Sequence, residues 1–109
     1  MDIDQRPGRI TVEHLRRGLL RVVCPARVEV FAGRSTVMID AAHNVASIDA
    51  LVRTLSDQFS PQQRWLVFAT SRDKDAAGML QQLLPWFDTV IFTRYRNNPR
   101  GVDPSELAA

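Results

Sequence analysis

Residues 36–44 of this chain have the sequence Thr-Val-Met-Ile-Asp-Ala-Ala-His-Asn. The apolar and β-branched residues at 36–39 predict a buried strand. Apolar residues then recur with helical spacing, at positions 45, 48, 51, 52, 55 and 59. Asp40, His43 and Asn44 therefore lie where a strand ends and a helix begins. Open α/β sheets bind ligands at such places, and the N–H groups of the helix attract anions there.

The same order of strand, polar loop and helix follows further along the chain. Residues 65–69 predict an apolar strand, 70–75 a polar loop, 76–84 a helix and 89–93 a further strand. Upstream, a hairpin-length turn at 32–35 joins a strand at 27–31 to the one at 36–40, which predicts antiparallel pairing. We therefore expect an α/β domain: a mostly parallel sheet with helices on both faces and an antiparallel N-terminal strand.

The two ends of the chain each carry a helix signal. Thr11 is placed to cap a helix that runs to about Val22, with an apolar side that we expect to be buried, formed by Val12, Leu15, Leu19 and Leu20. Asp103, Pro104 and Glu106 form a capping signal for a second helix, which has almost no residues left to follow it. We expect the chain to be a fragment of a longer protein.

Composition bounds the class of protein. A length of 109 residues with 45% hydrophobic content predicts one globular domain, and the net charge is only +2. The arginines are dispersed without aromatic partners, so we expect no nucleic-acid surface. Apolar stretches fall short of the ~20 residues that cross a bilayer. With one cysteine and no signal peptide, these features favour a cytoplasmic protein with no membrane partner.

The loops at 40–44, 70–75 and 93–100 should line up at one edge of the sheet and form a polar crevice. Asp40 suits ribose hydroxyls, a metal ion or an ammonium group, or equally the backbone N–H groups of its own turn. His43 suits a phosphate, although a lone histidine is more often a packed or surface residue. Lys74 suits a carboxylate or phosphate, or is a solvated lysine between two aspartates. Asn44 is most simply the N-cap of the following helix.

Several motifs are missing from the sequence. It has neither of the glycine-rich phosphate loops, no serine or cysteine nucleophile elbow and no carboxylate cluster for a two-metal site. We therefore expect no metal site, and half of a nucleotide or anion site whose other half lies elsewhere.

Four motifs occur in a familiar order: residues 24–29, 39–44, 73–75 and 98–100. Together they resemble the C-terminal domain of the folylpolyglutamate synthase/dihydrofolate synthase family, in the Mur ligase superfamily, over about residues 15–107. The resemblance implies a Rossmann-like domain at 27–109, incomplete at its C-terminus, after a connector with a helix at 1–26. Cys24 and Ala69 depart from the pattern, standing where tryptophan and glycine are usual.

The resemblance also implies an activity. That family uses ATP and Mg²⁺ to join L-glutamate to a folate carboxylate through an acyl phosphate, and an N-terminal P-loop ATPase domain supplies the phosphate loop and metal ligands. Arg27 would reach the ATP phosphates, Asp40 would hold the ribose, and His43 would bind nucleotide as the catalytic residue. Lys74 would bind the incoming glutamate. Alone, the chain is expected to be inactive and to hold no cofactor tightly.

Three alternatives stand beside this interpretation. Another Mur-type amino-acid ligase would usually carry a D-Y-A-H-x-P motif in place of residues 40–45. A non-catalytic module would bind nucleotide or another anion without turnover. A small response-type α/β domain would need an acid cluster at its first strand end, where this chain has Asp40 alone.

Overall fold

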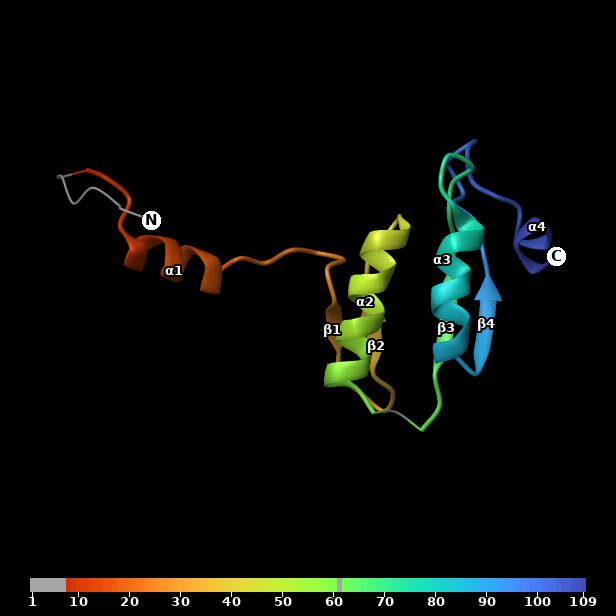
Figure 1. Ribbon diagram of the computed structural model, residues 1–109, viewed down its shortest axis with the longest axis horizontal. Coiled ribbons are helices and arrows are strands. Elements are labelled where there is room, and N and C mark those ends of the chain that lie inside the picture. The colour runs from red at the N-terminus through yellow and green to blue at the C-terminus, as the bar shows by residue number, and fades with distance from the viewer. Residues whose placement is uncertain (1–7, 61) are drawn as a thin grey trace. The chain divides into compact units, whose positions relative to one another are not determined.

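The computed structural model describes residues 8–60 and 62–109. They belong to two compact units, an N-terminal unit (Met1–Asp40) and a C-terminal unit (Ala41–Ala109). Figure 1 shows the elements of each. The first seven residues of the expected connector lie outside the described residues.

The N-terminal unit contains α1 (Val12–Leu20) and the strands β1 (Glu29–Phe31) and β2 (Val37–Ile39). Thr11 caps α1 as predicted, because its Oγ1 accepts a hydrogen bond from the backbone N–H of His14 at 3.1 Å. The His14 ring completes the cap by accepting from the Thr11 N–H at 3.3 Å.

The prediction that the apolar side of α1 is buried is wrong. No residue of α1 is buried by the part of the chain that the structure describes, and Leu19 and Leu20 are 74% and 78% exposed. Periodicity shows which side of a helix is apolar, but burial of that side needs a packed partner, which no local pattern supplies.

The strands β1 and β2 form an antiparallel hairpin in which Glu29 pairs with Ile39 and Phe31 with Val37. This pairing confirms the prediction made from the short turn. The hairpin register places Asp40 directly after β2, twelve residues beyond Val28, with which it interacts.

The C-terminal unit is a strand–helix–strand arrangement with a helix before and after it. Its elements are α2 (Val45–Gln58), β3 (Trp65–Phe68), α3 (Ala76–Leu83) with the short helix η1 (Leu84–Trp86), β4 (Thr89–Phe92) and α4 (Pro104–Ala108). The strands β3 and β4 are parallel neighbours, with Trp65 opposite Thr89 and Phe68 opposite Phe92. The predicted strands and helices thus occur close to their expected bounds.

One hydrophobic core holds this unit together. It joins α2, β3 and α3 through Ile48, Phe68, Met79, Leu80 and Leu83. The Phe68 ring also meets the ring of Phe92 on β4 edge to face, at a centroid distance of 6.4 Å. Figure 1 shows α2 and α3 beginning at the same end of the unit, the end to which the β4 arrow points.

The single mostly parallel sheet is not observed. The described strands form two separate two-stranded sheets, β1–β2 and β3–β4, so β2 is not a hydrogen-bonded neighbour of β3. Helices on both faces are not observed either, because Trp65 and Val67 on the outer face of β3 are 64% and 63% exposed. A short apolar run predicts a strand, but its partner strand and the cover on each face are set by tertiary contacts.

Candidate anion and nucleotide site

The loops that follow β3 and β4 are joined to each other. The backbone O of Thr70 accepts from the N–H of Val102 at 3.0 Å, and the N–H of Arg72 donates to the O of Arg100 at 2.8 Å. Between these bonds Ser71 and Gly101 form an antiparallel bridge. The predicted alignment of the loops at 70–75 and 93–100 is therefore observed, and backbone bonds fix it.

Lys74 lies in the first of these loops with an acid on each side. Its Nζ is 3.5 Å from Oδ2 of Asp73, and its side chain is one-third exposed. The other neighbour, Asp75, caps α3 by accepting from the Gly78 N–H at 2.9 Å. Lys74 is thus ion-paired with one aspartate and remains open to solvent.

Asp73 is held as a carboxylate. A hydrogen bond from the Ser71 hydroxyl at 2.5 Å and the local backbone lower the pKa of Asp73 below its usual 3.8, with smaller contributions from Lys74 and Arg100. A ligand carboxylate that approaches Lys74 would therefore compete with a charged partner that is already in place.

The second loop is rich in arginine and lines a hollow of about 420 Å³. The lining residues are Arg94, Tyr95, Arg96, Asn98, Pro99 and Gly101. Tyr95 braces the loop against the end of β3, because its hydroxyl donates to the backbone O of Ala69 at 3.2 Å. Two guanidinium groups and an amide give this hollow the character of an anion site.

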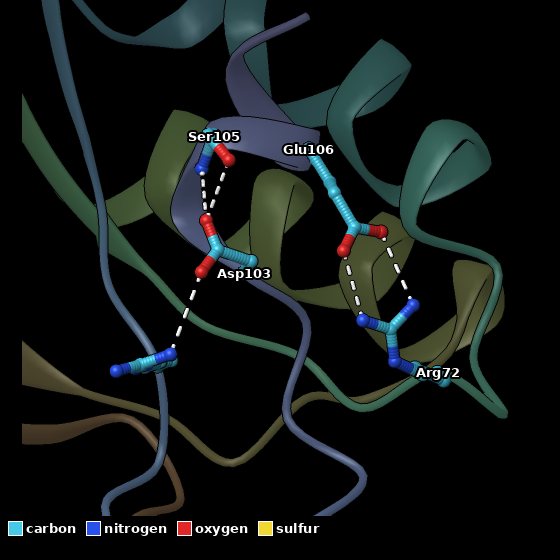
Figure 2. Close-up of polar contacts among 5 residues, drawn as sticks. Arg72, Asp103, Ser105 and Glu106 are labelled. Atoms are coloured by element: carbon cyan, nitrogen blue, oxygen red, sulfur yellow. Dashed lines mark hydrogen bonds and ion pairs between the residues drawn. The ribbon is translucent and has the colours of Figure 1, made fainter.

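Two acids at α4 tie this helix to both loops (Figure 2). Asp103 caps α4, as predicted, by accepting from the Ser105 N–H at 2.9 Å and from its hydroxyl at 2.6 Å. Its other oxygen lies 3.4 Å from Nη1 of Arg94. These contacts, the Ser105 bonds foremost, lower the pKa of Asp103.

The predicted capping-box role of Glu106 is wrong. Glu106 instead accepts two hydrogen bonds from Arg72, at 3.1 and 2.8 Å, and this pairing raises the pKa of the arginine. No local sequence pattern predicts such a bidentate pair, because its two residues are 34 positions apart.

His43 and Asn44 open α2. Asn44 is the N-cap, as predicted, and accepts from the Ser47 N–H at 2.8 Å, while the Ser47 hydroxyl reaches back to the Asn44 N–H. Nδ1 of His43 is 3.0 Å from the backbone O of Ala41, which can only accept, so this contact requires a proton on Nδ1. The exposed ring then presents Nε2 as its other nitrogen. Asn44 and Ser47 form a capping box, and the presence of Ser47 at the third helical position is the sequence signal that could have predicted it.

The starts of α2 and α3 lie against each other. A Cβ added to Gly78 in the first turn of α3 would come within 2.9 Å of Cγ2 of Val45 in the first turn of α2. His43 and Lys74, which precede these two turns, are therefore on neighbouring helix ends. Both N-termini carry the positive end of a helix dipole. The Asp75 carboxylate already caps α3, whereas the cap of α2 is the uncharged Asn44, so the start of α2 favours a further anion.

Arg27 and Asp40 belong to the N-terminal unit. Oδ2 of Asp40 accepts from the Val28 N–H at 2.8 Å. This carboxylate therefore contacts backbone, which was the expected alternative to a ligand contact, but the backbone N–H lies across the hairpin and not in its own turn. Arg27 is exposed between two residues with left-handed backbone, Ala26 (φ 53°) and Val28 (φ 49°). The sequence pattern gave no sign of these conformations.

Residues 8–60 and 62–109 contain neither a metal-binding cluster nor a helix that could cross a membrane. No group of three His, Cys, Asp or Glu side chains is placed to hold a metal ion. None of the described helices has the length and apolar character needed to cross a membrane.

Comparison with known proteins identifies the family. Residues 26–109 match the model of the glutamate ligase domain of Mur ligases. This chain belongs to the Mur ligase family. A dihydrofolate synthase/folylpolyglutamate synthase of Mycobacterium tuberculosis is 39% identical over 94 residues, which cover 86% of the chain and 19% of that protein. The Mur ligase domain therefore spans about a fifth of the length of this relative, and the resemblance inferred from the four motifs is confirmed.

Solved structures agree with this assignment. The Mur ligase domain matches the folylpolyglutamate synthase of M. tuberculosis complexed with ADP and AMPPCP at a TM-score of 0.82 and 37% identity, over 91% of the chain and 22% of that structure. A bifunctional folylpolyglutamate synthase/dihydrofolate synthase with Mn, AMPPNP and L-glutamate bound matches at 0.78 and 28%, over 91% and 24%. A UDP-N-acetylmuramyl-tripeptide synthetase of Latilactobacillus sakei is 32% identical over 99 residues, covering 86% of the chain and 19% of that protein.

Proposed function

We propose that this chain is the C-terminal domain of a ligase that uses ATP to join L-glutamate to a folate carboxyl group. In that reaction ATP phosphorylates the acid, and the amine of glutamate displaces phosphate from the acyl phosphate. The geometry that supports the proposal is the pair of neighbouring helix starts, with His43 before one and Lys74 before the other. The glutamate amine attacks the carbonyl carbon of the acyl phosphate, so two negatively charged groups, the phosphoryl group and the glutamate carboxylate, must be bound near one another, and this end of the unit favours anions.

Each candidate residue has a distinct task in this proposal. Arg27 is exposed and suits the ATP phosphates, and Asp40 suits the ribose hydroxyls. Because Nδ1 of His43 is committed to Ala41, the contact with developing negative charge on the phosphoryl group falls to Nε2, which donates there in the doubly protonated ring. The Lys74 ammonium takes the glutamate carboxylate and leaves its 3.5 Å contact with Asp73 to do so.

The metal ion belongs to the rest of the enzyme in this proposal. Mg²⁺ prefers several oxygen ligands, and the described residues hold no cluster of carboxylates that would supply them. An N-terminal P-loop ATPase domain of the same protein would contribute the phosphate loop and the Mg²⁺ ligands, with residues 1–26 as its connector to the domain at 27–109. The 109-residue chain alone should then show no ligation and at most millimolar nucleotide affinity, about −4 kcal/mol.

Steady-state kinetics of the intact protein, with each substrate varied separately, test the assignments. Asp40→Ala should raise KM for ATP, since a ribose contact exists before and during the reaction. Lys74→Ala should raise KM for glutamate by roughly tenfold to a hundredfold and leave ATP nearly unchanged. His43→Ala should mainly lower kcat. Arg53→Ala is the matched control, because Arg53 is an exposed, ion-paired cation further along α2.

Two outcomes would contradict the proposal, and each would favour an alternative function. Ligation of a peptidoglycan precursor in place of folate would assign the chain to another Mur-type amino-acid ligase. Tight ATP binding by the isolated chain in calorimetry, without turnover in any longer form, would favour the non-catalytic nucleotide or anion-binding module. Unchanged glutamate kinetics in Lys74→Ala would return that residue to a solvated lysine.

A further inference from the structure

The backbone on either side of Arg27 has a conformation that side chains disfavour. Ala26 has φ 53° and Val28 has φ 49°, both in the left-handed region. There the Cβ atom crowds the following carbonyl oxygen, and a β-branched residue such as valine is a true outlier. Backbone of this kind persists only where the surrounding structure holds it.

Two carboxylates hold these two residues. Oε2 of Glu29 accepts from the Ala26 N–H at 2.9 Å, and Oδ2 of Asp40 accepts from the Val28 N–H at 2.8 Å. Both are hydrogen bonds to a charged acceptor, which are shorter and stronger than neutral ones. All four residues are half-buried, so water competes only partly for these bonds.

Arg27 itself is exposed, so packing does not fix its direction. Its Cα–Cβ bond is directed by the backbone on its two sides, and that backbone is held by Glu29 and Asp40 through the hairpin of β1 and β2. The two carboxylates come from opposite strands, at the start of β1 and just after the end of β2.

We propose that Glu29 and Asp40 are positioning residues that hold Ala26 and Val28 in left-handed conformations and thereby direct Arg27 at the nucleotide phosphates. This inference rests on the proposed function for the role of Arg27. It gives Asp40 a task besides any ribose contact, and it gives Glu29 a task where no other has been assigned.

Glu29 provides the sharper test, because it has no assigned ligand. In the intact protein, Glu29→Ala should lower kcat/KM for ATP about tenfold and change KM for glutamate by less than about twofold. Glu29→Gln keeps a carbonyl acceptor and should retain most of the activity. Ala26→Gly removes the Cβ that makes the conformation costly, so Ala26→Gly combined with Glu29→Ala should recover most of the loss.

The same design separates the two tasks of Asp40. The loss in Asp40→Ala that Val28→Gly recovers reports the backbone contact, and the remaining loss reports the nucleotide contact. Glu13→Ala is the control, since Glu13 is an exposed, ion-paired carboxylate on α1 and should leave all parameters unchanged.

Amide hydrogen exchange measured by NMR gives a readout that does not depend on activity. Glu29→Ala should speed exchange at Ala26, and Asp40→Ala should speed it at Val28, while Glu13→Ala changes neither. Unchanged exchange in both variants would overturn the positioning role. Faster exchange with unchanged ATP kinetics would overturn it too. An intact wild-type protein that does not ligate glutamate would refute the proposed function, and the exchange data would still decide whether the carboxylates hold this backbone.

Discussion

The helices α1 and α2 begin with the same kind of reciprocal cap but differ in how far they are buried. Thr11 and His14 cap each other at the start of α1, and Asn44 and Ser47 do so at the start of α2. Yet the described residues bury no part of α1, whereas α2 contributes Ile48, 3% exposed, to the core of its unit. Capping and periodicity act over one helical turn, so they form a helix wherever it lies. Burial depends on what the rest of the protein brings to that helix.

The largest expected difference between the units concerns their apolar side chains. Met79→Ala removes a side chain that is 1% exposed and should lower the free energy of unfolding by about 2–5 kcal/mol. Leu19→Ala removes one that is 74% exposed and should change it by less than about 0.5 kcal/mol. Urea unfolding of the 109-residue chain, followed by circular dichroism, measures both. Equal losses would mean that the apolar side of α1 is covered in solution.

Replacing a glycine by alanine should change the stability of the two units in opposite directions. A Cβ at Gly78 would overlap the Asp75 carboxylate and approach Val45 to 2.9 Å, so Gly78→Ala should destabilise the C-terminal unit by about 1–3 kcal/mol. A Cβ at Gly18 in α1 meets nothing within 4 Å, so Gly18→Ala should stabilise that helix by up to about 1 kcal/mol. Thermal unfolding compares the two variants. A stabilised Gly78→Ala protein would show that the starts of α2 and α3 can move apart.

The two matched caps should differ in their effect on global stability. Asn44→Ala should cost about 1 kcal/mol, because α2 is part of a packed core and its start cannot fray without disturbing Val45. Thr11→Ala should reduce the helicity of α1 but leave the unfolding of the C-terminal unit unchanged, since α1 has no residue that the described part of the chain buries. Amide exchange at His14 and Ser47 separates local fraying from global unfolding. A shift in C-terminal stability on Thr11→Ala would contradict the independence of α1.

Local chemistry explains which parts of the fold were predictable. The short turn at 32–35 brings β1 to β2, and Thr11, Asn44 and Asp103 mark helix starts by their own side chains. The joined loops after β3 and β4 follow from parallel pairing, because parallel strands end at one edge. Residue types alone predicted these features.

The features that were missed depend on residues far apart in the sequence. Arg72 meets Glu106 across 34 positions, and Asp40 meets Val28 across twelve, and neither pair follows a local period. The left-handed backbone of Val28 contradicts its own residue type and is explained only by the groups that hold it. At the candidate site, residue types single out Lys74 and His43 as candidates, but they give no sign of the two carboxylates that contact the backbone on either side of Arg27.

The smallest expected effect is a pH response confined to α4. The hydroxyl and N–H of Ser105, then Arg94 and Arg72, lower the pKa of Asp103 below its unfolded value of 3.8. A carboxyl group with a depressed folded pKa stabilises the fold above its unfolded pKa, and this contribution is lost as the pH falls through the lower, folded pKa. The cap of α4 should therefore be intact at pH 5 and above and come apart only below pH 3.8, whereas the uncharged Asn44 cap of α2 should not respond. The amide chemical shifts of Ser105 and Ser47, followed from about pH 6 to pH 2, measure the two caps in one titration. Asp103→Asn keeps the acceptor oxygen without the charge and should abolish the response at Ser105. A Ser105 shift that titrates above pH 3.8, or one that persists in Asp103→Asn, would show that another group controls this helix end.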